Sequence, residues 1–279
     1  MKKSLPYIMD AYEKKYAIPQ FNIINLEWAK YILEECQEQK SPVFLGVSTS
    51  AAKYMGGYNV VVAMVRALVK DLNITIPVMI HLDHSKTVED CRKAFDAGFD
   101  SIMIDASLNS LEENVKMTNE VVAFAYDTVI EAEIGQIGGA EDSDEIELKY
   151  TSTDEASEFV NQVTIDMLAP ALGSAHGVYK GKPEIKFDIM EEINVTINKP
   201  LVLHGCSGLS DEILTEAIKH GVCKMNFDTE LKLAWNKAIR EFIANSNEYD
   251  GRKIIGAGEQ AIKSVVRNYI SCLGSKDRG

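Results

Sequence analysis

The sequence predicts an α/β fold: a single (β/α)8 TIM barrel with an extra C-terminal helix. Short β-branched runs alternate with segments of helical periodicity, and eight such units fit into 279 residues, which matches the barrel in count and length. A doubly wound sheet usually has fewer strands and a glycine-rich turn after its first strand, whereas the turn here is Asn22-Ile23-Ile24-Asn25. No linker, charge block or internal repeat divides the sequence, so residues 1–279 are expected to form one domain, with 274–279 as a flexible tail.

The predicted strands are short runs rich in β-branched and apolar residues. They are Ala17–Ile23, Val43–Val47, Pro77–Leu82, Ser101–Ile104, Val129–Glu133, Met167–Leu172, Leu201–His204 and Cys223–Phe227. Active sites of (β/α)8 barrels lie at the C-terminal ends of the strands. The residues that end these runs are therefore the first candidates for a functional site.

The predicted helices carry apolar residues at a spacing of three to four. They are Leu26–Gln39, Asn59–Asp71, Val88–Ala97, Leu111–Tyr126, Asp154–Val163, Phe187–Ile193, Asp211–His220 and Thr229–Ala244, and one more is expected after Ile255. Thr153 and Ser210, each followed by an acid, supply oxygens for the free amides at two of these helix starts.

The charge balance argues against two classes of partner. Lys and Arg number 29 against 42 Asp and Glu, a formal net charge of −13. Nucleic acids and anionic lipids bind to clustered basic residues, so the surface is expected to repel both. An anionic ligand would need a local positive site.

The sequence carries no signal for a membrane or for an oxidising compartment. No stretch approaches the roughly 20 apolar residues that a bilayer requires, and the opening Met1–Pro6 lacks the apolar region of a secretory signal. The five cysteines are odd in number, widely spaced and free of Cys-x-x-Cys, which favours neither a disulfide framework nor a cysteine zinc site. A cytoplasmic location is expected.

Four of the five histidines fall at or just beyond predicted strand ends. His84, His176 and His204 come from three different strand ends and can converge over the barrel mouth. Three imidazoles with an open fourth position are a known catalytic zinc arrangement. His81 shares strand parity with Asp83, so we expect it in or against the strand layer rather than on the metal.

Acidic residues follow the same strand ends. Asp83, beside a candidate ligand, could exchange a proton with a substrate atom or, alternatively, orient an imidazole. Glu133 is another acid directed at the mouth. The acidic run Gly138–Glu145 reads mostly as a solvated surface, but a glycine pair before one acid also describes a mobile lid that carries a base.

Two glycine-rich turns, 173–181 and 204–208, complete this face. Glycine lets backbone amides approach an anion, although it often only makes a bend, and Ser207 and Lys180 add a hydroxyl and a charge. The loops after strands 7 and 8 of such barrels commonly hold phosphate, and the turn at Asn226 opens a helix there. A metal, an acid and a phosphate site together suggest polarisation of a carbonyl in a phosphorylated substrate.

In this order the motifs resemble the class II (zinc-dependent) fructose-bisphosphate and tagatose-bisphosphate aldolases. The resemblance covers nearly the whole chain. It is carried by Gln20-Phe21-Asn22, Gly46-Val47-Ser48, Tyr54-Met55-Gly56-Gly57, His81-Leu82-Asp83-His84, Met103-Ile104-Asp105-Ala106-Ser107, Glu131-Ala132-Glu133, Leu168-Ala169-Pro170-Ala171-Leu172-Gly173, His176-Gly177, Lys180-Gly181, Leu203-His204-Gly205, and Asn226 with Thr229.

The resemblance implies cleavage of a ketose 1,6-bisphosphate into dihydroxyacetone phosphate and glyceraldehyde 3-phosphate. It implies one catalytic Zn²⁺ on His84, His176 and His204, with Asp105 and Glu133 at positions that can hold a second or alternative metal. Such relatives can also bind a monovalent cation near the glycine-rich turns. They assemble as homodimers or homotetramers with the C-terminal helix at the interface.

The resemblance also implies roles for the other site residues. Asp83 would exchange a proton with the C4 hydroxyl, Glu141 with the dihydroxyacetone phosphate carbon, and Asn226 would contact the enediolate. Ser48 would face the aldehyde half. The cradle of the C1 phosphate would be Gly177, Lys180, Gly205, Ser207, Asp228 and Thr229.

Three departures from the family pattern bear on the substrate. Ser50 stands where close relatives often have glycine, and Cys206 where many have a second glycine. Glu259 stands where relatives commonly have an arginine that reaches a neighbouring subunit and binds the far phosphate. A carboxylate there would repel phosphate by about 1–4 kcal/mol. A local shift of sequence, with Arg252, Lys253 or Arg267 in that role, is the other interpretation.

Two alternative functions follow from these departures. One is a related zinc aldolase with a different aldehyde half, acting on a ketose 1-phosphate or on a deoxy-sugar-acid phosphate of inositol breakdown. The other is a non-catalytic barrel that binds a sugar phosphate. The second alternative would need a broken catalytic set, whereas the histidines, Asp83, Glu141 and Asn226 are all present.

Overall fold

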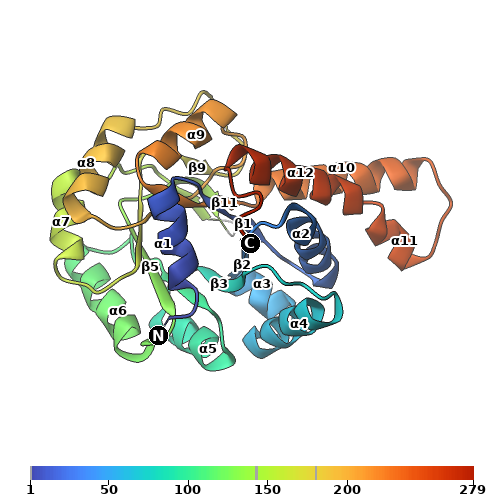
Figure 1. Ribbon diagram of the computed structural model, residues 1–279, viewed down its shortest axis with the longest axis horizontal. Helices are drawn as coiled ribbons and strands as arrows, with labels where there is room; N and C mark the ends of the chain where they lie inside the picture. Colours follow the sequence, from blue (N-terminus) through green and yellow to red (C-terminus); the bar gives the residue numbers. More distant parts are fainter. Residues whose placement is uncertain (1, 142–143, 180) are drawn as a thin grey trace.

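The protein folds as a closed barrel of parallel strands surrounded by helices, as a computed structural model shows (Figure 1). The structure describes residues 2–141, 144–179 and 181–279. Within these ranges it describes all side chains except those of residues 140–146. The strand order is β1-β11-β10-β8-β5-β4-β3-β2, and β1 pairs with both β11 and β2, which closes the barrel. The predicted (β/α)8 barrel is confirmed.

All eight predicted strands are present, with small shifts at their ends. They are β1 (Ile18–Asn22), β2 (Val43–Ser48), β3 (Val78–Ser85), β4 (Ser101–Ile104), β5 (Val129–Ile134), β8 (Met167–Pro170), β10 (Leu201–Leu203) and β11 (Val222–Phe227).

The helices include all those predicted, among them the extra C-terminal one. They are α1 (Leu5–Lys14), α2 (Leu26–Gln39), α3 (Thr49–Tyr54), α4 (Tyr58–Asp71), α5 (Val88–Ala97), α6 (Leu111–Phe124), α7 (Thr153–Val160), α8 (Phe187–Ile197), α9 (Asp211–Lys219), α10 (Thr229–Ala244), α11 (Gly251–Gly256) and α12 (Glu259–Cys272). The sequence did not predict α1, α3 and α11. The cap of α7 is Ser152, which forms a capping box with Glu155, and not the predicted Thr153; Ser210 precedes α9 but makes no side-chain cap bond.

Alternation along each strand divides the core into two parts, as β5 illustrates. Ile130 and Ile134 face outward and pack in the apolar layer between strands and helices. Val129, Glu131 and Glu133 alternate with them and face the barrel interior. The interior is therefore apolar near the strand N-termini and polar near the C-terminal mouth.

Helix α1 closes the N-terminal end of the barrel. Its buried Ile8 and Ala11 pack in one apolar cluster with Ile18, Phe44, Met79, Val129, Met167, Ala169, Val202 and Cys223, residues near the starts of the barrel strands. Figure 1 shows α1 lying across this end. The interior is thus open toward solvent on the side of the mouth.

A small second sheet lies at the mouth. Its strands are β6 (Gly138–Glu141), β7 (Asp144–Ile146) and β9 (Ala175–His176), in the order β7-β6-β9. In the acidic segment predicted as a surface loop or lid, the described backbone therefore forms the antiparallel strands β6 and β7, and β6 pairs with β9 next to His176.

The C-terminal segment forms an arm and a docked tail. Helices α10 and α11 project from the barrel (Figure 1), and α12 returns to pack against α2. The last residues differ from the predicted flexible tail: Ser275 is buried, and the amides of Asp277 and Gly279 donate to the carbonyls of Gln39 and Lys40. These hydrogen bonds hold the C-terminal backbone against the end of α2, where a flexible tail was expected.

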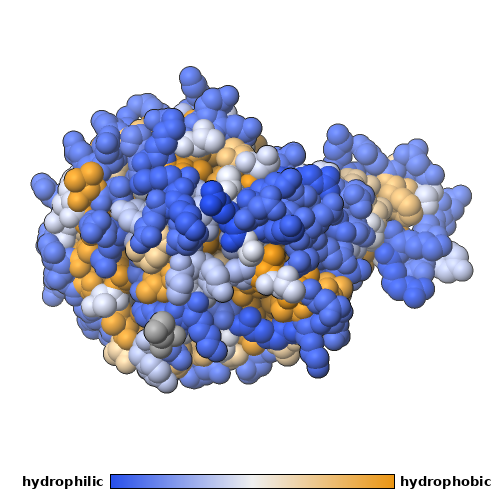
Figure 2. Space-filling view, in the orientation of Figure 1, coloured by the Kyte–Doolittle hydropathy of each residue, from blue (hydrophilic) through white to orange (hydrophobic). Residues whose placement is uncertain are grey.

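The surface in Figure 2 is predominantly hydrophilic, in keeping with the net charge of −13. Of the helices in the described residues, none is both long and apolar enough to cross a membrane.

Candidate active site

Three histidines from different parts of the barrel rim converge at the mouth. His84 lies in β3, His176 ends β9, and His204 directly follows β10. The ring centroids are 4.3 Å apart for His84 and His204, 4.8 Å for His84 and His176, and 6.1 Å for His176 and His204. One nitrogen from each ring lies within 4.8 Å of the others. The structure thus brings together the three predicted ligands.

A local distortion of β3 allows two consecutive residues to face the mouth. The pairing of β3 with β4 shifts register between Leu82 and Ser85, and His84 has a φ of 45°. In a regular strand, Asp83 and His84 would point to opposite sides. The bulge and the left-handed backbone turn His84 inward beside Asp83, so both line the same cavity.

His204 is held by hydrogen bonds at both ring nitrogens. Nε2 lies 2.7 Å from Oε1 of Glu131, and Nδ1 lies 3.0 Å from Nδ2 of Asn226. Burial and the neighbouring His84 lower the pKa of His204, although Glu131 raises it. A neutral imidazole is the form that binds a metal.

His176 is placed by the small second sheet. It pairs with Gly139, whose φ is +100°, and a Cβ on that glycine would lie only 2.1 Å from the carbonyl oxygen of His176. Burial, followed by the nearby His84 and His204, holds the pKa of His176 well below its usual value. Its buried Nδ1 has no hydrogen-bond partner among the described residues.

A second group of possible metal ligands shares His84 with the first. Nδ1 of His84 lies 3.4 Å from Asp105 and 3.5 Å from Glu133. Ser107 lies between the two acids, because its hydroxyl oxygen is 2.6 Å from Asp105 and 3.1 Å from Glu133, and its single proton can be directed to either. Burial alone would raise the pKa of Asp105, but its hydrogen bond with His84 and the Ser107 contacts lower it to about 2. The structure brings Asp105 and Glu133 together as the resemblance implied.

Asp83 lies at the centre of the mouth and is 4% exposed. Its two oxygens accept from the amides of Asn22 at 2.9 Å and Asn226 at 3.2 Å. Burial alone would raise the pKa of Asp83, but His84 and His204 beside it hold the pKa well below its usual range. The carboxylate is therefore ionised and able to accept a proton.

These residues surround a cavity of about 440 Å³. The predicted site residues that line it are Ser48, Asp83, His84, His176, Gly177, His204, Gly205, Ser207, Asn226, Asp228 and Thr229. Lys180 and the side chain of Glu141 lie outside the described residues. Ser50, at the first departure from the family pattern, also lines the cavity, and its hydroxyl lies 2.9 Å from that of Ser48.

The glycine-rich side of the cavity is connected to the start of α10. The hydroxyl of Ser207 accepts from the amides of Asp228 and Glu230, each at 3.3 Å. Gly205 has a φ of +64° and a Cβ there would lie 2.5 Å from a backbone oxygen, so the close approach of the two loops requires glycine. Tyr179 joins the loops because its hydroxyl donates to the carbonyl of Gly205 at 2.8 Å.

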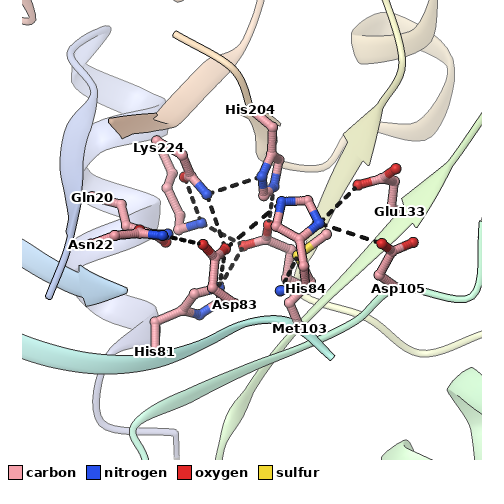
Figure 3. Close-up of polar contacts among 12 residues, drawn as sticks. Gln20, Asn22, His81, Asp83, His84, Met103, Asp105, Glu133, His204 and Lys224 are labelled. Atoms are coloured by element: carbon pink, nitrogen blue, oxygen red, sulfur yellow. Dashed lines mark hydrogen bonds and ion pairs between the residues drawn. The ribbon is translucent and has the colours of Figure 1, made fainter. Parts of the chain in front are cut away.

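Several polar residues beneath the mouth were not predicted as part of the site. Lys224 and Glu131 form a fully buried ion pair at 2.9 Å. Gln20 donates to Asn22, which in turn holds Asp83 (Figure 3). Strand parity could have identified two of them. Glu131 lies two residues before Glu133, and Lys224 two residues before Asn226, so each faces the same side of its strand as a predicted site residue.

His81 lies in the barrel interior, as its parity suggested. It is fully buried, and its Nδ1 lies 2.8 Å from the hydroxyl of Ser101. Burial, reinforced by the Lys224 ammonium, lowers the pKa of His81 to about 3 against the opposite effects of Glu131 and Asp83. The imidazole is neutral at pH 7.

At the start of α12, Glu259 forms an ion pair with Lys263 at 2.6 Å, and Lys263 also contacts Glu34. The basic residues named as substitutes for the missing arginine are engaged within the chain as well. Arg252 pairs with Asp250, Lys253 with Glu248 and Arg267 with Glu35. Cys206 is fully buried, and burial raises the pKa of its thiol well above the usual value.

Comparisons with known proteins agree with this geometry. The family described as "Fructose-bisphosphate aldolase class-II" matches residues 3–278. A fructose-bisphosphate aldolase of Geobacillus stearothermophilus is 49% identical over 273 residues, or 96% of this chain and 95% of that protein. One from Staphylococcus epidermidis is 47% identical over 275 residues, or 97% and 96%. The crystal structure of the YdjI aldolase from Escherichia coli K12 has a TM-score of 0.86 at 31% identity and covers 98% of this chain and 97% of that one. The chain belongs to the class II fructose-bisphosphate aldolase family.

Proposed function

We propose that this protein is a zinc-dependent aldolase that reversibly cleaves a ketose 1,6-bisphosphate, fructose or tagatose, into dihydroxyacetone phosphate and glyceraldehyde 3-phosphate. The observation that carries the proposal is the convergence of three imidazoles with Asp83 and Asn226 on one cavity. The alternatives, an aldolase of different aldehyde scope and a non-catalytic barrel, are not favoured, because relatives with nearly half of the residues identical are fructose-bisphosphate aldolases.

The residues at the mouth fit a zinc ion. His84, His176 and His204 would hold it, since one nitrogen of each lies within 4.8 Å of the others, and the lowered pKa values of His176 and His204 favour the neutral form that binds a metal. Nδ1 of His176 is buried and has no hydrogen-bond partner among the described residues, and a bound metal would satisfy it. When bound, the metal would act as a Lewis acid on the ketose carbonyl. Asp105 and Glu133 would offer His84 an alternative or second site.

Asp83 is the proposed proton acceptor for the C4 hydroxyl. It is ionised, and two amides hold both of its oxygens in place at the cavity. As the C3–C4 bond breaks, the C4 hydroxyl proton passes to Asp83 and the aldehyde leaves. In the condensation direction the same proton returns.

Asn226 is the proposed donor to the oxygen that gains negative charge as the bond breaks. Its Nδ2 faces the cavity between Asp83 and His204. A donor held in place there stabilises charge that develops only in the transition state. Glu141 is assigned the protonation of the remaining carbanion from the resemblance alone.

The phosphate of the dihydroxyacetone half is assigned to the loops that carry Gly177, Gly205 and Ser207, with Asp228 and Thr229 at the start of α10. A bound monovalent cation near Gly177 and Gly205 remains part of the proposal. Lys180 would contribute a positive charge to an otherwise acidic protein.

Two further properties complete the proposal. The projecting arm carries exposed apolar side chains, with Leu233 and Ile243 each 55% and Tyr249 94% exposed, which supports a homodimer or homotetramer built through the C-terminal segment. All five cysteines are free thiols in the described structure, which supports a reducing cytoplasm.

The test is the release of dihydroxyacetone phosphate, followed by a coupled enzyme, from fructose 1,6-bisphosphate, tagatose 1,6-bisphosphate and fructose 1-phosphate, with and without a chelator. Chelator-sensitive cleavage of a bisphosphate is expected, and the preferred bisphosphate reports the C4 stereochemistry. Cleavage of the monophosphate alone would show that Glu259 marks a real change of substrate. No cleavage of any of the three would contradict the proposal.

A further inference from the structure

A fully buried ion pair lies directly beneath the mouth and has no role in the mechanism above. Nζ of Lys224, on β11, lies 2.9 Å from Oε2 of Glu131, on β5, and both side chains are 0% exposed. These strands are not neighbours in the barrel, so the pair spans the interior. Each partner also contacts a residue at the mouth: Lys224 contacts Asn226, and Glu131 contacts His204.

Lys224 determines how the amide of Asn226 is turned. Its ammonium donates to Oδ1 of Asn226 at 2.9 Å, and an ammonium has no acceptor to offer the NH₂ group. The amide oxygen must therefore point down toward Lys224. Nδ2 is left facing upward, 3.2 Å from Asp83 and 3.0 Å from His204.

Glu131 determines how the ring of His204 is presented. Its other oxygen, Oε1, lies 2.7 Å from Nε2 of His204 and accepts a hydrogen bond from that nitrogen, which keeps its proton. Nδ1 is then the unprotonated nitrogen, on the side of Asn226 and the cavity. Carboxylates that hold a histidine in this way fix its tautomer and its orientation toward a metal.

We propose that Lys224 and Glu131 are positioning residues: Lys224 holds the NH₂ group of Asn226 at the cavity, where it would donate to the substrate, and Glu131 holds the unprotonated Nδ1 of His204 at the cavity, where it would bind the metal in place of its hydrogen bond with Asn226. The inference rests on the proposed function, since it assigns both residues to the aldolase site. Beyond that function, it states that one buried ion pair orients both Asn226, the donor to the substrate, and His204, a metal ligand.

Stability alone does not account for the pair. Replacing a buried ion pair by apolar residues of similar size is often neutral or stabilising, because both charges lose their hydration when they are buried. Apolar side chains already fill the layer just below, where Phe44 and Met79 pack. An apolar pair at positions 131 and 224 would continue that layer.

The test replaces the pair as a unit, with Lys224→Met and Glu131→Met in one protein. The melting temperature of the metal-free protein is expected to stay close to the wild-type value. Zinc affinity, measured by competition with a chromophoric chelator, should fall about 10- to 100-fold, and kcat should fall by a similar factor with a smaller change in KM. Should the methionine pair not fold, Lys224→Leu with Glu131→Leu provides a second apolar pair, which likewise offers no donor to Asn226 and no acceptor to His204, with the same expectations.

The matched control is Lys199→Met. Lys199 lies just before β10, far from the mouth end of that strand, and its Nζ donates to the carbonyl of Ile165 at 3.1 Å. The same chemical change there should leave zinc affinity and kcat unchanged.

A double-mutant cycle separates positioning from a general structural role. With zinc saturating, so that the weaker binding caused by the change at Glu131 no longer limits activity, replacing the pair in an Asn226→Ala background should lower kcat much less than in the wild type if Lys224 acts through the amide of Asn226. Unchanged zinc affinity in the pair variant, or the same loss of kcat with and without Asn226, would overturn the proposal. Failure of the proposed function would look different, because the wild type itself would then show no chelator-sensitive cleavage.

Discussion

His81 makes the stability of the metal-free protein depend on pH. Burial lowers its folded pKa to about 3, whereas the pKa in the unfolded chain is about 6.5. The unfolded state therefore binds more protons between these two values, and stability present above about pH 6.5 is lost as the pH falls through that range. His81 alone should remove about 2 kcal/mol from the free energy of unfolding between about pH 8 and pH 5.

The assay is urea unfolding of chelator-treated wild type and His81→Asn at both pH values. Asparagine can still bond to Ser101 through its amide, but it does not titrate. The loss of unfolding free energy from pH 8 to pH 5 should be smaller in the variant by about 2 kcal/mol. His176 and His204, whose pKa values are also lowered, remain in both proteins and account for a residual slope. An equal loss in both proteins would refute the argument that His81 is buried as a neutral ring.

The remaining predictions concern the metal and the residues around it. Adding zinc to the metal-free protein should raise its melting temperature, with about 4 kcal/mol of stabilisation at a thousandfold excess over the dissociation constant; a calorimetric scan that zinc does not shift would contradict the metal site. Asp83→Asn should lower kcat about 10²- to 10⁴-fold in steady-state assays while the chelator-competition affinity for zinc changes little. Gly139→Ala should weaken zinc binding and lower the melting temperature, because its Cβ would meet the backbone of His176, whereas Gly251→Ala, which meets no atom within 4 Å, should do neither.

Most of the barrel could be predicted because the spacing of apolar residues along the sequence indicates each strand and helix. The eight strands are short runs bounded by turn signals, and helices such as Leu26–Gln39 and Val88–Ala97 appear with the predicted bounds. The missed elements are short or depend on distant partners. Strand β9 has two residues and exists only because Gly139 pairs with His176 across the chain.

The main residues of the site could be predicted because they lie at the ends of predicted strands. The rest could not, because their placement depends on contacts between distant parts of the chain. Strand ends identify His84, His176 and His204, and strand parity separates His81 from them. That Asp83 and His84 both face inward depends on a bulge against β4 and a positive φ, neither of which is written in the local sequence. The Lys224–Glu131 pair joins strands that are not adjacent, so only the closed barrel reveals it.

The position of α1 imposes an order on biosynthesis. Ile8 and Ala11 leave the ribosome early, but the surface that covers them includes Val202 of β10 and Cys223 of β11. About 200 residues separate α1 from β11, which at about 5–20 residues per second corresponds to about 10–40 s of translation. During that time the surface that covers the apolar face of α1 lacks its last strands. The inner core of the barrel can therefore be completed only when nearly the whole chain has been made.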